Sequence, residues 1–486
     1  MGGAYEAVIG LEVHVQLRTR AKMFCACRNA AGEPPNTLTC PVCLGLPGTL
    51  PVLNGEAVRL ALALGAAVGA RIQPRSAFYR KQYFYPDLPK GYQITQGPVA
   101  LVEGGHLEIP GDPAVRGAEG PVAIRLERAH LEEDSGKSQH DAGSRDSRVD
   151  LNRAGVPLLE VVGAPDLRSA QEASDFMRAL HRLVVALGIC EGNLEEGHFR
   201  CDANVSLRPA GAAAFGTRVE VKNLNSFRFL RQALAFEVAR QADLLEGGGA
   251  VVPETRGWDA AAGETRSQRS KEEAMDYRFF PEPDLPVLEV SEAEVAAARA
   301  ALPELPDQRA RRWREAHGLG EDEIQALGQS PAFAAYFEAV AGASGSGRGA
   351  AAWVLGEVSR VLNARGLGIE AFPVPPDVLG ALVRLVEART LAFGAAREQV
   401  FPELLQGERD PAAVVARKGL AQVGDRAAIE ALVARVLADH PGQVAQVRAG
   451  KVALKGFLVG QVLKAGQGRL DARVVQEVLA AALDGG

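Results

Sequence analysis

Strict alternation of apolar and polar residues marks the first part of the chain and limits what it can fold into. In residues 8–17 the odd positions from Ile9 to Leu17 are apolar, whereas Glu12, His14 and Gln16 are polar. Because successive side chains of a strand point to opposite faces, this pattern predicts a half-buried antiparallel strand. Similar alternation predicts strands over 199–207 and 217–222. We therefore expect an antiparallel sheet with one apolar and one polar face.

The alternation changes phase once, within residues 122–134. Val122, Ile124 and Leu126 are apolar at even positions, and then Ala129 and Leu131 are apolar at odd positions. One extra residue near 127–128 accounts for the change, so we predict a β-bulge there.

Helical signals interrupt the strands and then replace them. Ser169 and Glu172 form a capping-box sequence before a helical apolar pattern that ends at Gly188. A second helix is expected after Ser226 and before Gly247. From about residue 290 helical patterns dominate, with a flexible Gly/Ser-rich loop predicted over 341–349 and a break near 407–411, where Pro411 begins a helix. The fold class is therefore α+β, with a large mixed body, a helical connector and a small helical C-terminal domain.

Composition excludes several classes of protein. No stretch of about 18 apolar residues is present, so we expect no membrane span. The first residues lack the basic and apolar regions of a signal peptide, which leaves the cytoplasm as the expected location. A net charge of −6, from 54 Lys+Arg against 60 Asp+Glu, argues against a globally basic nucleic-acid-binding chain.

A local basic excess lies near the C-terminus. Residues 448–473 contain six cations and one acid, Asp471; the cations are Arg448, Lys451, Lys455, Lys464, Arg469 and Arg473. A negatively charged polymer is the simplest partner for such a segment. A solvated helix face is the alternative explanation.

Four of the six cysteines lie within 19 residues, as Cys25-x-Cys27 and Cys40-x-x-Cys43. Four thiolates suit tetrahedral Zn²⁺ in a closed structural site. The alternative is reduced thiols that pack as small apolar groups. Cys190 and Cys201 stand apart from any candidate base, and we expect both in the core.

The polar faces of the predicted strands carry carboxylates and histidines. These are Glu12 and His14, then Glu127, His130, Glu132 and Asp134, and then Asp150 and Glu160. Phosphoryl transfer needs a hard cation such as Mg²⁺, which carboxylates bind. A solvated sheet face is the alternative. A P-loop is excluded, because the Gly-Lys-Ser at 136–138 would need glycine at position 131, where the chain has Leu131.

Two loops could contact nucleotides or RNA. Residues 81–93 mix Lys81, Tyr83 and Lys90 with further aromatic and turn residues, a composition that can stack a base while a lysine holds phosphate. A Pro-rich loop pinned by its own aromatics explains it equally well. Residues 264–271 combine three cations with three hydroxyls and suit a phosphate-binding loop or a solvated charged turn.

Taken together and in order, these segments resemble the B-subunit family of bacterial glutamyl/aspartyl-tRNA amidotransferases. The matching stretches are Ile9–Gln16, Cys40–Asn54, Tyr83–Gln93, Asp150–Val161, Arg200–Leu207, Glu220–Phe227, Glu264–Lys271, Asp276–Pro286 and Gly456–Ala465. The resemblance runs from about residue 4 to the end, and several motifs are ten or more residues long.

The resemblance implies a domain plan and a reaction. It implies a cradle-like catalytic domain over 1–290 with a zinc-binding insertion (25–43), a helical domain over 291–407 and a tRNA-binding tail over 408–486. ATP would phosphorylate the side-chain carboxylate of Glu-tRNA(Gln) or Asp-tRNA(Asn), and ammonia would then displace the phosphate. The implied partners are a glutaminase (amidase) subunit, a small third subunit, tRNA(Gln) or tRNA(Asn) and a non-discriminating aminoacyl-tRNA synthetase. ATP, Mg²⁺ and structural Zn²⁺ are the implied cofactors.

The resemblance also assigns roles to residues. The expected catalytic residues are Glu12, His14, Glu127, Arg200 and Lys222; the Mg²⁺ ligands are Glu12, His14, Glu127 and Glu160; the Zn²⁺ ligands are Cys25, Cys27, Cys40 and Cys43; the ATP contacts are Arg266, Arg269 and Lys271; and the tRNA contacts are Lys81, Tyr83, Lys90, Arg448, Lys451, Lys455 and Lys464. No glutaminase-type nucleophile site is evident, which predicts a separate ammonia-producing subunit. The alternative function is a non-catalytic scaffold that presents tRNA to a catalytic partner.

Overall fold

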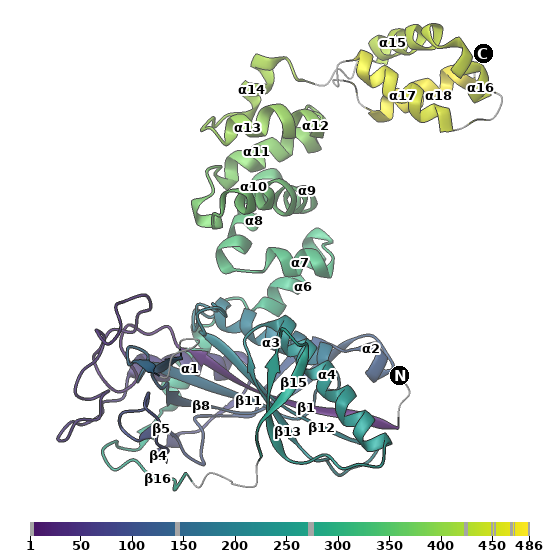
Figure 1. Ribbon diagram of the computed structural model, residues 1–486. Helices are drawn as coiled ribbons and strands as arrows, with labels where there is room; N and C mark the ends of the chain where they lie inside the picture. Colours follow the sequence, from purple (N-terminus) through teal and green to yellow (C-terminus); the bar gives the residue numbers. More distant parts are fainter. Residues whose placement is uncertain are drawn as a thin grey trace. The chain divides into compact units, whose positions relative to one another are not determined.

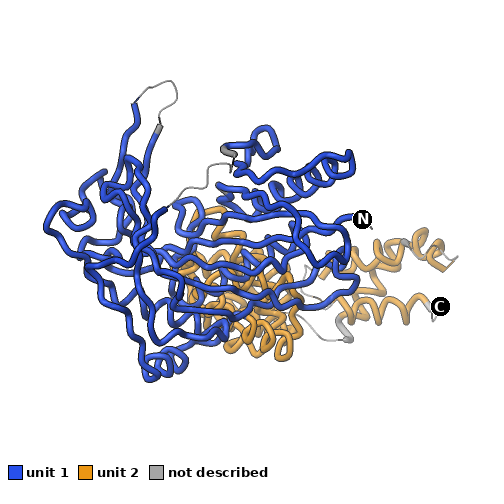
Figure 2. Tube along the Cα trace, turned by 90° about the horizontal axis from the view of Figure 1, so that it is seen from below, with its two compact units in different colours: residues 1–306 blue, residues 307–486 orange. Residues whose placement is uncertain are grey.

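The computed structural model divides into two compact units, Met1–Pro306 and Asp307–Gly486 (Figure 2). The structure describes residues 4–140, 146–270, 277–421, 426–448, 451, 453–466, 470 and 472–484. Strands lie in the first unit and helices dominate the second (Figure 1). The predicted α+β fold class is therefore confirmed.

The described strands all belong to the first unit. They are β1 (Tyr5–Gln16), β2 (Arg71–Ile72), β3 (Arg75–Ser76), β4 (Phe78–Gln82), β5 (Tyr92–Gln96), β6 (Val102–Glu103), β7 (His106–Pro110), β8 (Pro121–Glu133), β9 (Lys137–His140), β10 (Ser147–Asp150), β11 (Pro157–Gly163), β12 (Phe199–Pro209), β13 (Val219–Leu224), β14 (Glu254–Asp259), β15 (Glu264–Ser270), β16 (Phe280–Pro281) and β17 (Leu288–Glu289). The long path of the main sheet is β15-β14-β13-β12-β1-β11-β8-β5-β4-β16. Its pairs are antiparallel except for β13 with β14, which is parallel.

Most of the helices follow the sheet region in the chain. They are α1 (Gly55–Ala67), α2 (Pro113–Arg116), α3 (Ala170–Ala186), α4 (Phe227–Glu246), α5 (Glu292–Ala300), α6 (Pro306–His317), α7 (Glu321–Leu327), α8 (Pro331–Ser344), α9 (Gly347–Trp353), α10 (Ser359–Arg365), α11 (Pro376–Glu387), α12 (Phe393–Ala395), α13 (Phe401–Leu404), α14 (Pro411–Lys418), α15 (Arg426–Asp439), α16 (Pro441–Arg448), α17 (Ala453–Ala465) and α18 (Ala472–Asp484). Two π-helical segments, Val354–Val358 and Ala396–Val400, and a 3₁₀ turn, Ile369–Ala371, complete them.

The central strand β1 has the two faces that its sequence predicts. Ile9, Leu11, Val13 and Val15 are fully buried in the core, whereas Glu12, His14 and Gln16 are half-buried on the other face. Helix α3 packs against β1 and β7, and α4 packs against β12, β13 and β15 (Figure 1). The helices thus pack on the apolar face of the sheet, and the polar side chains of β1 lie on the opposite face.

The predicted β-bulge is present in β8. Val162 of β11 pairs with Arg128, and the next residue, Gly163, pairs with Leu126. Glu127 is therefore the extra residue that lets the apolar positions change from even to odd. After the bulge, His130 and Glu132 share the polar face of the sheet.

The helix ends follow the predicted capping signals. The Ser169 hydroxyl accepts a hydrogen bond from the backbone N–H of Glu172 at 3.1 Å, and Gly188 adopts φ +67° just after α3. The carboxylate of Glu172 completes no capping box, because it binds Arg116 instead. Helix α4 begins after Ser226 and ends before Gly247, as expected.

The prediction of a flexible loop over 341–349 is wrong. Helix α8 continues to Ser344 and α9 begins at Gly347, so only Gly345 and Ser346 connect them. The small residues permit close helix packing instead of flexibility: a Cβ on Gly380 of α11 would lie 2.4 Å from the Cβ of Ala343. Composition alone cannot distinguish these two uses of glycine and serine.

Two further cores lie in the second unit. One includes Trp313, Phe337 and Phe401 and extends through Val414 and Val415 of α14. Helix α14 begins at Pro411 as predicted, with Asp410 as its N-cap, and it packs with the helical connector that precedes it. The other core is formed by α15–α18 around Leu458 and Val462. Within the described residues, no helix has both the length and the apolar composition needed to cross a bilayer.

Candidate functional site

The register of four adjacent strands aligns a row of polar side chains across the open face. On β1, His14 lies opposite Arg200 of β12 and opposite Glu160 of β11, and Glu160 lies opposite His130 of β8. The row Arg200–His14–Glu160–His130 therefore follows from pairing alone. Glu132, two residues after His130, points to the same face.

This row contains a compact group of potential metal ligands. His14 Nε2 lies 3.5 Å from Glu132 Oε1 and 3.5 Å from Glu160 Oε2, and His130 Nε2 lies 3.4 Å from Glu160 Oε2. Ligand atoms of His14, Glu132 and Glu160 all lie within 4.8 Å of one another. Two carboxylates and an imidazole at this spacing suit a divalent cation, with water or phosphate oxygens filling the remaining positions.

The charges in this group are strongly coupled. Burial would lower the pKa of His14, but its hydrogen bond to Glu160 and the charge of Glu132 outweigh burial and raise the pKa to about 9. Burial likewise opposes ionisation of Glu160, yet the hydrogen bonds from His130 and His14 hold its pKa well below the usual range. Burial and the charge of Glu160 raise the pKa of Glu132. A bound dication would replace the proton that His14 otherwise carries.

The four predicted magnesium ligands do not gather in one place. His14 and Glu160 are together, but Glu127 sits exposed on the bulge and lines a neighbouring pocket with Glu12. That pocket has a volume of about 230 Å³, and Asn204 there donates a hydrogen bond to Glu12 at 2.9 Å. Burial, and then the charge of Glu160, raise the pKa of Glu12. Glu132 takes the place in the ligand group that the sequence analysis gave to Glu127. The sequence held a signal for this: after the bulge, Glu132 lies two residues from His130 and therefore on the same face of β8.

Arg200 is held beside the row by an acid at the end of β8. Its guanidinium donates to Asp134 at 3.0 Å, and Arg153 also approaches Asp134, at 3.4 Å. Arg153 further donates to the backbone oxygens of Ser135 and Gly136. Arg200 is therefore positioned next to His14 by a contact outside the row.

Lys222 lies on the same sheet, two strands from β1. Its ammonium is 3.0 Å from Asp202 and 3.0 Å from Glu220. Burial would lower the pKa of Lys222, but these two carboxylates outweigh it and raise the pKa. Lys222 is thus a fixed cation at neutral pH.

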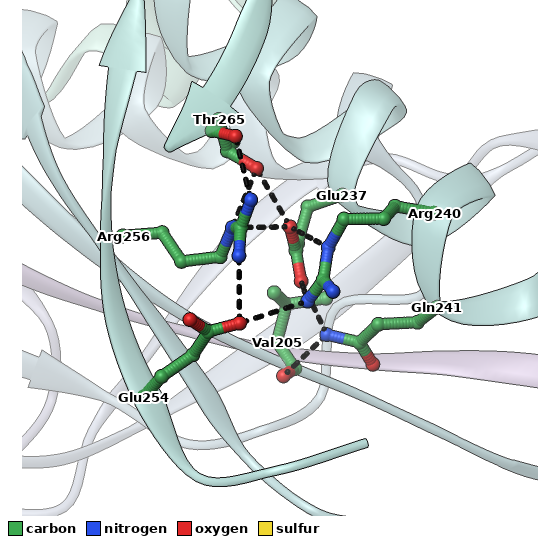
Figure 3. A network of polar contacts seen from close by, with 7 residues as sticks. All are labelled: Val205, Glu237, Arg240, Gln241, Glu254, Arg256 and Thr265. Atoms are coloured by element: carbon green, nitrogen blue, oxygen red, sulfur yellow. Dashed lines mark hydrogen bonds and ion pairs between the residues drawn. The ribbon is translucent and has the colours of Figure 1, made fainter. Parts of the chain in front are cut away.

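A buried polar network anchors the β14–β15 hairpin to α4 (Figure 3). Glu237 of α4 is fully buried and accepts hydrogen bonds from Arg240 at 2.6 and 2.9 Å and from the Thr265 hydroxyl at 2.9 Å. Arg256 of β14 donates to Glu254 at 2.7 Å and to the backbone oxygen of Thr265 at 2.6 Å. Two carboxylates and two guanidiniums balance in charge here, so the network joins three elements without a net buried charge.

The hairpin carries Arg266 and Arg269, two of the three predicted ATP contacts. Arg266 follows Thr265 and is exposed, within 2.9 Å of Glu264 and 3.3 Å of Asp259. Arg269 lies on β15, but its side chain, like the whole of Lys271, lies outside the described part of the chain. The network therefore fixes the strand from which Arg266 projects.

The four clustered cysteines converge as the spacing predicts. The Sγ atoms of Cys25, Cys27, Cys40 and Cys43 all lie within 4.8 Å of one another. Lys22 is fully buried beside them, with Nζ 3.9 Å from Cys43 Sγ and 2.7 Å from the backbone oxygen of Leu38. A buried ammonium next to thiols suits a cluster of thiolates, which is the form that binds zinc. Cys190 and Cys201 are both buried in the core, as predicted.

The predicted RNA-contact residues are placed differently from one another. Lys81 lines a cavity of about 490 Å³ together with His130, Glu132 and Glu160. Lys90, by contrast, pairs with Glu133, and its side chain is only 8% exposed, so it does not face solvent as a contact of tRNA would. In the tail, Arg448, Lys451 and Lys464 are exposed. Lys455 is half-buried, and Arg469 is outside the described residues.

Comparisons with known proteins cover the whole chain. Residues 7–296 match the family model "GatB/GatE catalytic domain", and residues 335–483 match the model "GatB domain". A protein of Geobacter sulfurreducens is 50% identical over 485 residues, covering 99% of this chain and 100% of the relative. A protein of Halorhodospira halophila is 53% identical over 482 residues, covering 99% of each. Both relatives carry the name of the B subunit of aspartyl/glutamyl-tRNA(Asn/Gln) amidotransferase.

The first prediction concerns the anchor of the β14–β15 hairpin. Replacing Glu237→Gln removes one buried negative charge between Arg240 and Arg256, which costs about 3 kcal/mol of local stability. Amide hydrogen exchange in residues 254–270 should accelerate about 100-fold. Glu264→Gln, which removes an exposed partner of Arg266, should leave the exchange unchanged. Equal exchange in the two variants would contradict an anchoring role.

The second prediction concerns His14 in the metal-free protein. Its imidazole should titrate near pH 9 by NMR, while His181, whose pKa burial lowers, titrates below 6.5 in the same sample. Because the pKa of an unfolded histidine is about 6.5, the contact stabilises the fold fully below that pH and its contribution is lost as pH rises through about 9. Glu160→Gln should bring the His14 pKa down, and a wild-type His14 that titrates at or below 6.5 would contradict the coupling.

Proposed function

This chain belongs to the GatB/GatE family of amidotransferase B subunits, and from that premise we propose that it amidates mischarged Glu-tRNA(Gln), Asp-tRNA(Asn) or both at the expense of ATP. The observation that carries the proposal is the row Arg200–His14–Glu160–His130 with Glu132 beside it. A solvated sheet face has no need to bring two carboxylates and two imidazoles within ion-pair distance.

The chemistry requires an activated carboxylate. A carboxylate oxygen is a very poor leaving group, so ammonia cannot displace it at neutral pH. In the proposed reaction the side-chain carboxylate attacks the γ-phosphorus of ATP and ADP departs, which gives an acyl phosphate. Ammonia then attacks the carbonyl carbon, the carbon–oxygen bond to phosphate breaks, and the nitrogen loses a proton. The products are the amide, ADP and phosphate.

The side chains of the row fit the first step. His14, Glu132 and Glu160 would hold Mg²⁺, which neutralises charge on phosphate oxygens when it is bound. Arg200 adds a fixed positive charge next to His14, held there by Asp134. Lys222 and Arg266 are the further candidates for phosphate contacts, because both project from strands on the β13–β15 side of the sheet. We propose that Arg269 and Lys271 contact ATP together with Arg266, as the sequence predicts.

Glu12 and Glu127 are two further acidic side chains near the row. They line a separate pocket with Asn204. The charge of Glu160 on the neighbouring strand β11 raises the pKa of Glu12, after burial as the larger cause. We propose that this pocket belongs to the same catalytic centre, with Glu12 and Glu127 keeping their predicted catalytic role next to the ligand group.

The ammonia and the tRNA involve other molecules. We propose that a partner amidase subunit hydrolyses glutamine to supply ammonia and that a small third subunit completes a heterotrimer. The relatives' name, which is that of a B subunit, supports an assembly with further subunits. The exposed Arg448, Lys451 and Lys464 of the tail would contact tRNA(Gln) or tRNA(Asn). A non-discriminating aminoacyl-tRNA synthetase would supply the mischarged tRNA, and all these steps would take place in the cytoplasm.

The cysteine cluster has a structural role in this proposal. Four thiolates would hold Zn²⁺ in a closed tetrahedral site with no position left for substrate. Lys22 compensates part of the negative charge that four thiolates leave on the complex.

The third prediction tests where catalysis resides. With free ammonia, ATP, Mg²⁺ and mischarged tRNA, Glu160→Gln should lower amidation at least about 100-fold, because the ligand group loses a carboxylate that would hold Mg²⁺, the ion that offsets negative charge on the phosphate oxygens. Its dissociation constant for tRNA should stay within twofold of the wild type. Glu108→Gln, an exposed strand substitution of the same kind, should leave both unchanged. Full activity in Glu160→Gln would favour the scaffold that only presents tRNA.

The fourth prediction tests the zinc site and its cation. Purified protein should contain one zinc per chain by elemental analysis. Lys22→Met should weaken zinc retention about 10-fold or more against a competing chelator, because it removes the buried charge beside Cys43. Arg20→Met removes an exposed cation two residues away and should retain zinc like the wild type. Equal retention in both variants would remove Lys22 from the site, and substoichiometric zinc would refute a loaded cluster.

A further inference from the structure

Two of the four clustered cysteines face a small cavity that opens to solvent. Among the described residues of its wall, Cys25 and Cys43 are the only thiols, and the volume is about 70 Å³. Gly45 and Leu46 belong to the same wall and are exposed, so the cavity reaches the surface. A bound water needs about 10–15 Å³ of such space, so the cavity also admits a molecule of the size of hydrogen peroxide.

These two thiols also lie next to each other. All six cysteines of the chain are free thiols, and the Sγ atoms of the four clustered ones lie within 4.8 Å of one another. Within the cluster, the Cys25 thiol donates a hydrogen bond to the sulfur of Cys43. A reagent that enters the cavity therefore meets two sulfurs already in contact.

A buried cation lies beside Cys43. Lys22 is fully buried, and its Nζ is 3.9 Å from Cys43 Sγ. The same ammonium donates to the backbone oxygens of Leu38, at 2.7 Å, and Leu151, at 3.4 Å. A neighbouring cation favours the thiolate, which is the form of cysteine that attacks peroxides. Cys43 thus combines access from solvent with an electrostatic reason for reactivity.

The two remaining cysteines of the chain provide the contrast. Cys190 is 2% exposed and Cys201 is 1% exposed, and both belong to the hydrophobic core. Burial raises the pKa of both thiols, which disfavours the reactive thiolate. We expect these two to stay reduced under conditions in which the clustered cysteines react.

We propose that Cys25 and Cys43 form a peroxide-sensitive thiol pair, which closes to a disulfide and thereby opens the zinc site. The Cys43 thiolate attacks one oxygen of hydrogen peroxide, the O–O bond breaks and hydroxide departs, which leaves Cys43 as a sulfenic acid. The Cys25 thiolate then attacks the sulfenic sulfur, the S–O bond breaks and a second hydroxide departs. Two thiolates lose two electrons to one peroxide, which becomes two waters after taking up two protons.

The disulfide removes two of the four ligands that would hold Zn²⁺. Cys27 and Cys40 alone cannot close a tetrahedral site, so the metal is released. The reaction also removes negative charge next to Lys22, whose ammonium stays fully buried. The proposal thus adds a reversible chemical step to a cluster that otherwise has only a structural role.

The 25–43 insertion holds the segment at the end of β10. The Asn36 side chain donates to the Val149 oxygen at 3.0 Å and accepts from the Leu151 N–H at 2.8 Å. From the other side, the Asn152 side chain accepts from the Leu38 N–H at 2.8 Å. Lys22 joins the same two segments through its bonds to Leu38 and Leu151. Loss of the metal should therefore loosen this segment together with the insertion.

The fifth prediction concerns which thiols react first. Hydrogen peroxide added to the full-length, zinc-loaded chain should form the Cys25–Cys43 disulfide first, with zinc released in parallel. Mass spectrometry of alkylated peptides identifies the pair, and a chromogenic chelator follows the zinc. Cumene hydroperoxide, whose ring is too bulky for the cavity, should react about 10-fold or more slowly than hydrogen peroxide, relative to the rates of both with free cysteine.

Two variants provide controls for this experiment. Cys25→Ser should leave Cys43 as a sulfenic acid that dimedone traps, because the second thiolate is missing. Cys190→Ala, which removes a core thiol, should react with peroxide like the wild type. Where Cys25→Ser does not fold, the map of disulfides in the wild-type chain still decides the question.

Amide hydrogen exchange tests the structural consequence. Oxidation should accelerate exchange in residues 149–152 about 10-fold, whereas exchange in β1 should stay unchanged. Amidation should fall in the same samples, and dithiothreitol with added Zn²⁺ should restore both. The amidation readout rests on the proposed function, but the disulfide, zinc and exchange readouts do not, so a failure of either proposal can be told from a failure of the other.

Other results would overturn the thiol pair. Six free thiols after a dose of peroxide that oxidises free cysteine would exclude it, and a first disulfide between any other two cysteines would exclude the cavity as the point of entry. A Cys25–Cys43 disulfide with zinc retained would show that the site stays closed. Sulfonic acids that dithiothreitol cannot reduce would indicate irreversible damage instead of a reversible step.

Discussion

The register of β1 between β11 and β12 is the constraint on which the candidate site depends. Burial of Ile9, Leu11, Val13 and Val15 fixes this register, because a slip by one residue would expose all four and bury His14. With the register fixed, Arg200, His14, Glu160 and His130 must lie side by side. The hydrophobic core on one face of the sheet thus positions the polar site on the other face.

The polar face of the sheet carries carboxylates whose burial disfavours their charged form and so does not help to stabilise the fold. Glu132 and Glu160 lie close together at low exposure, and burial works against the charged form of both. Such a like-charge pair persists in the metal-free protein because His14 carries a proton between them. A fold selected for stability alone would put apolar side chains at these positions. The strain that remains is what a bound dication would relieve, which ties the electrostatics of the apo site to its proposed chemistry.

The local sequence was sufficient to predict the strands and helices, but it was insufficient to predict which side chains contact one another in the fold. Alternation predicted β1 and even the bulge at Glu127, and capping residues predicted α3 and α4, because each depends on residues near in sequence. Glu132 was not assigned as a ligand, because its distance to His14 depends on two strand pairings at once. Lys90 has the same difficulty: its partner Glu133 lies 43 residues away, so composition suggested an exposed cation where the structure has a buried pair. The resemblance supplied the chemistry, but the positions of these charges required the fold.

The cysteine cluster connects to the row through a short path of contacts. Lys22 approaches both Cys43 and the backbone oxygen of Leu151, and the segment that follows Leu151 carries Arg153. Arg153 contacts Asp134, which in turn holds Arg200 next to His14. The 25–43 insertion would be a weak constraint as a reduced thiol loop, because free thiols form few directional contacts. As a closed thiolate site it would fix Lys22, and with it the segment that sets Arg153 against Asp134. A metal bound by the four cysteines would therefore help to hold Arg200 beside His14 through this series of contacts.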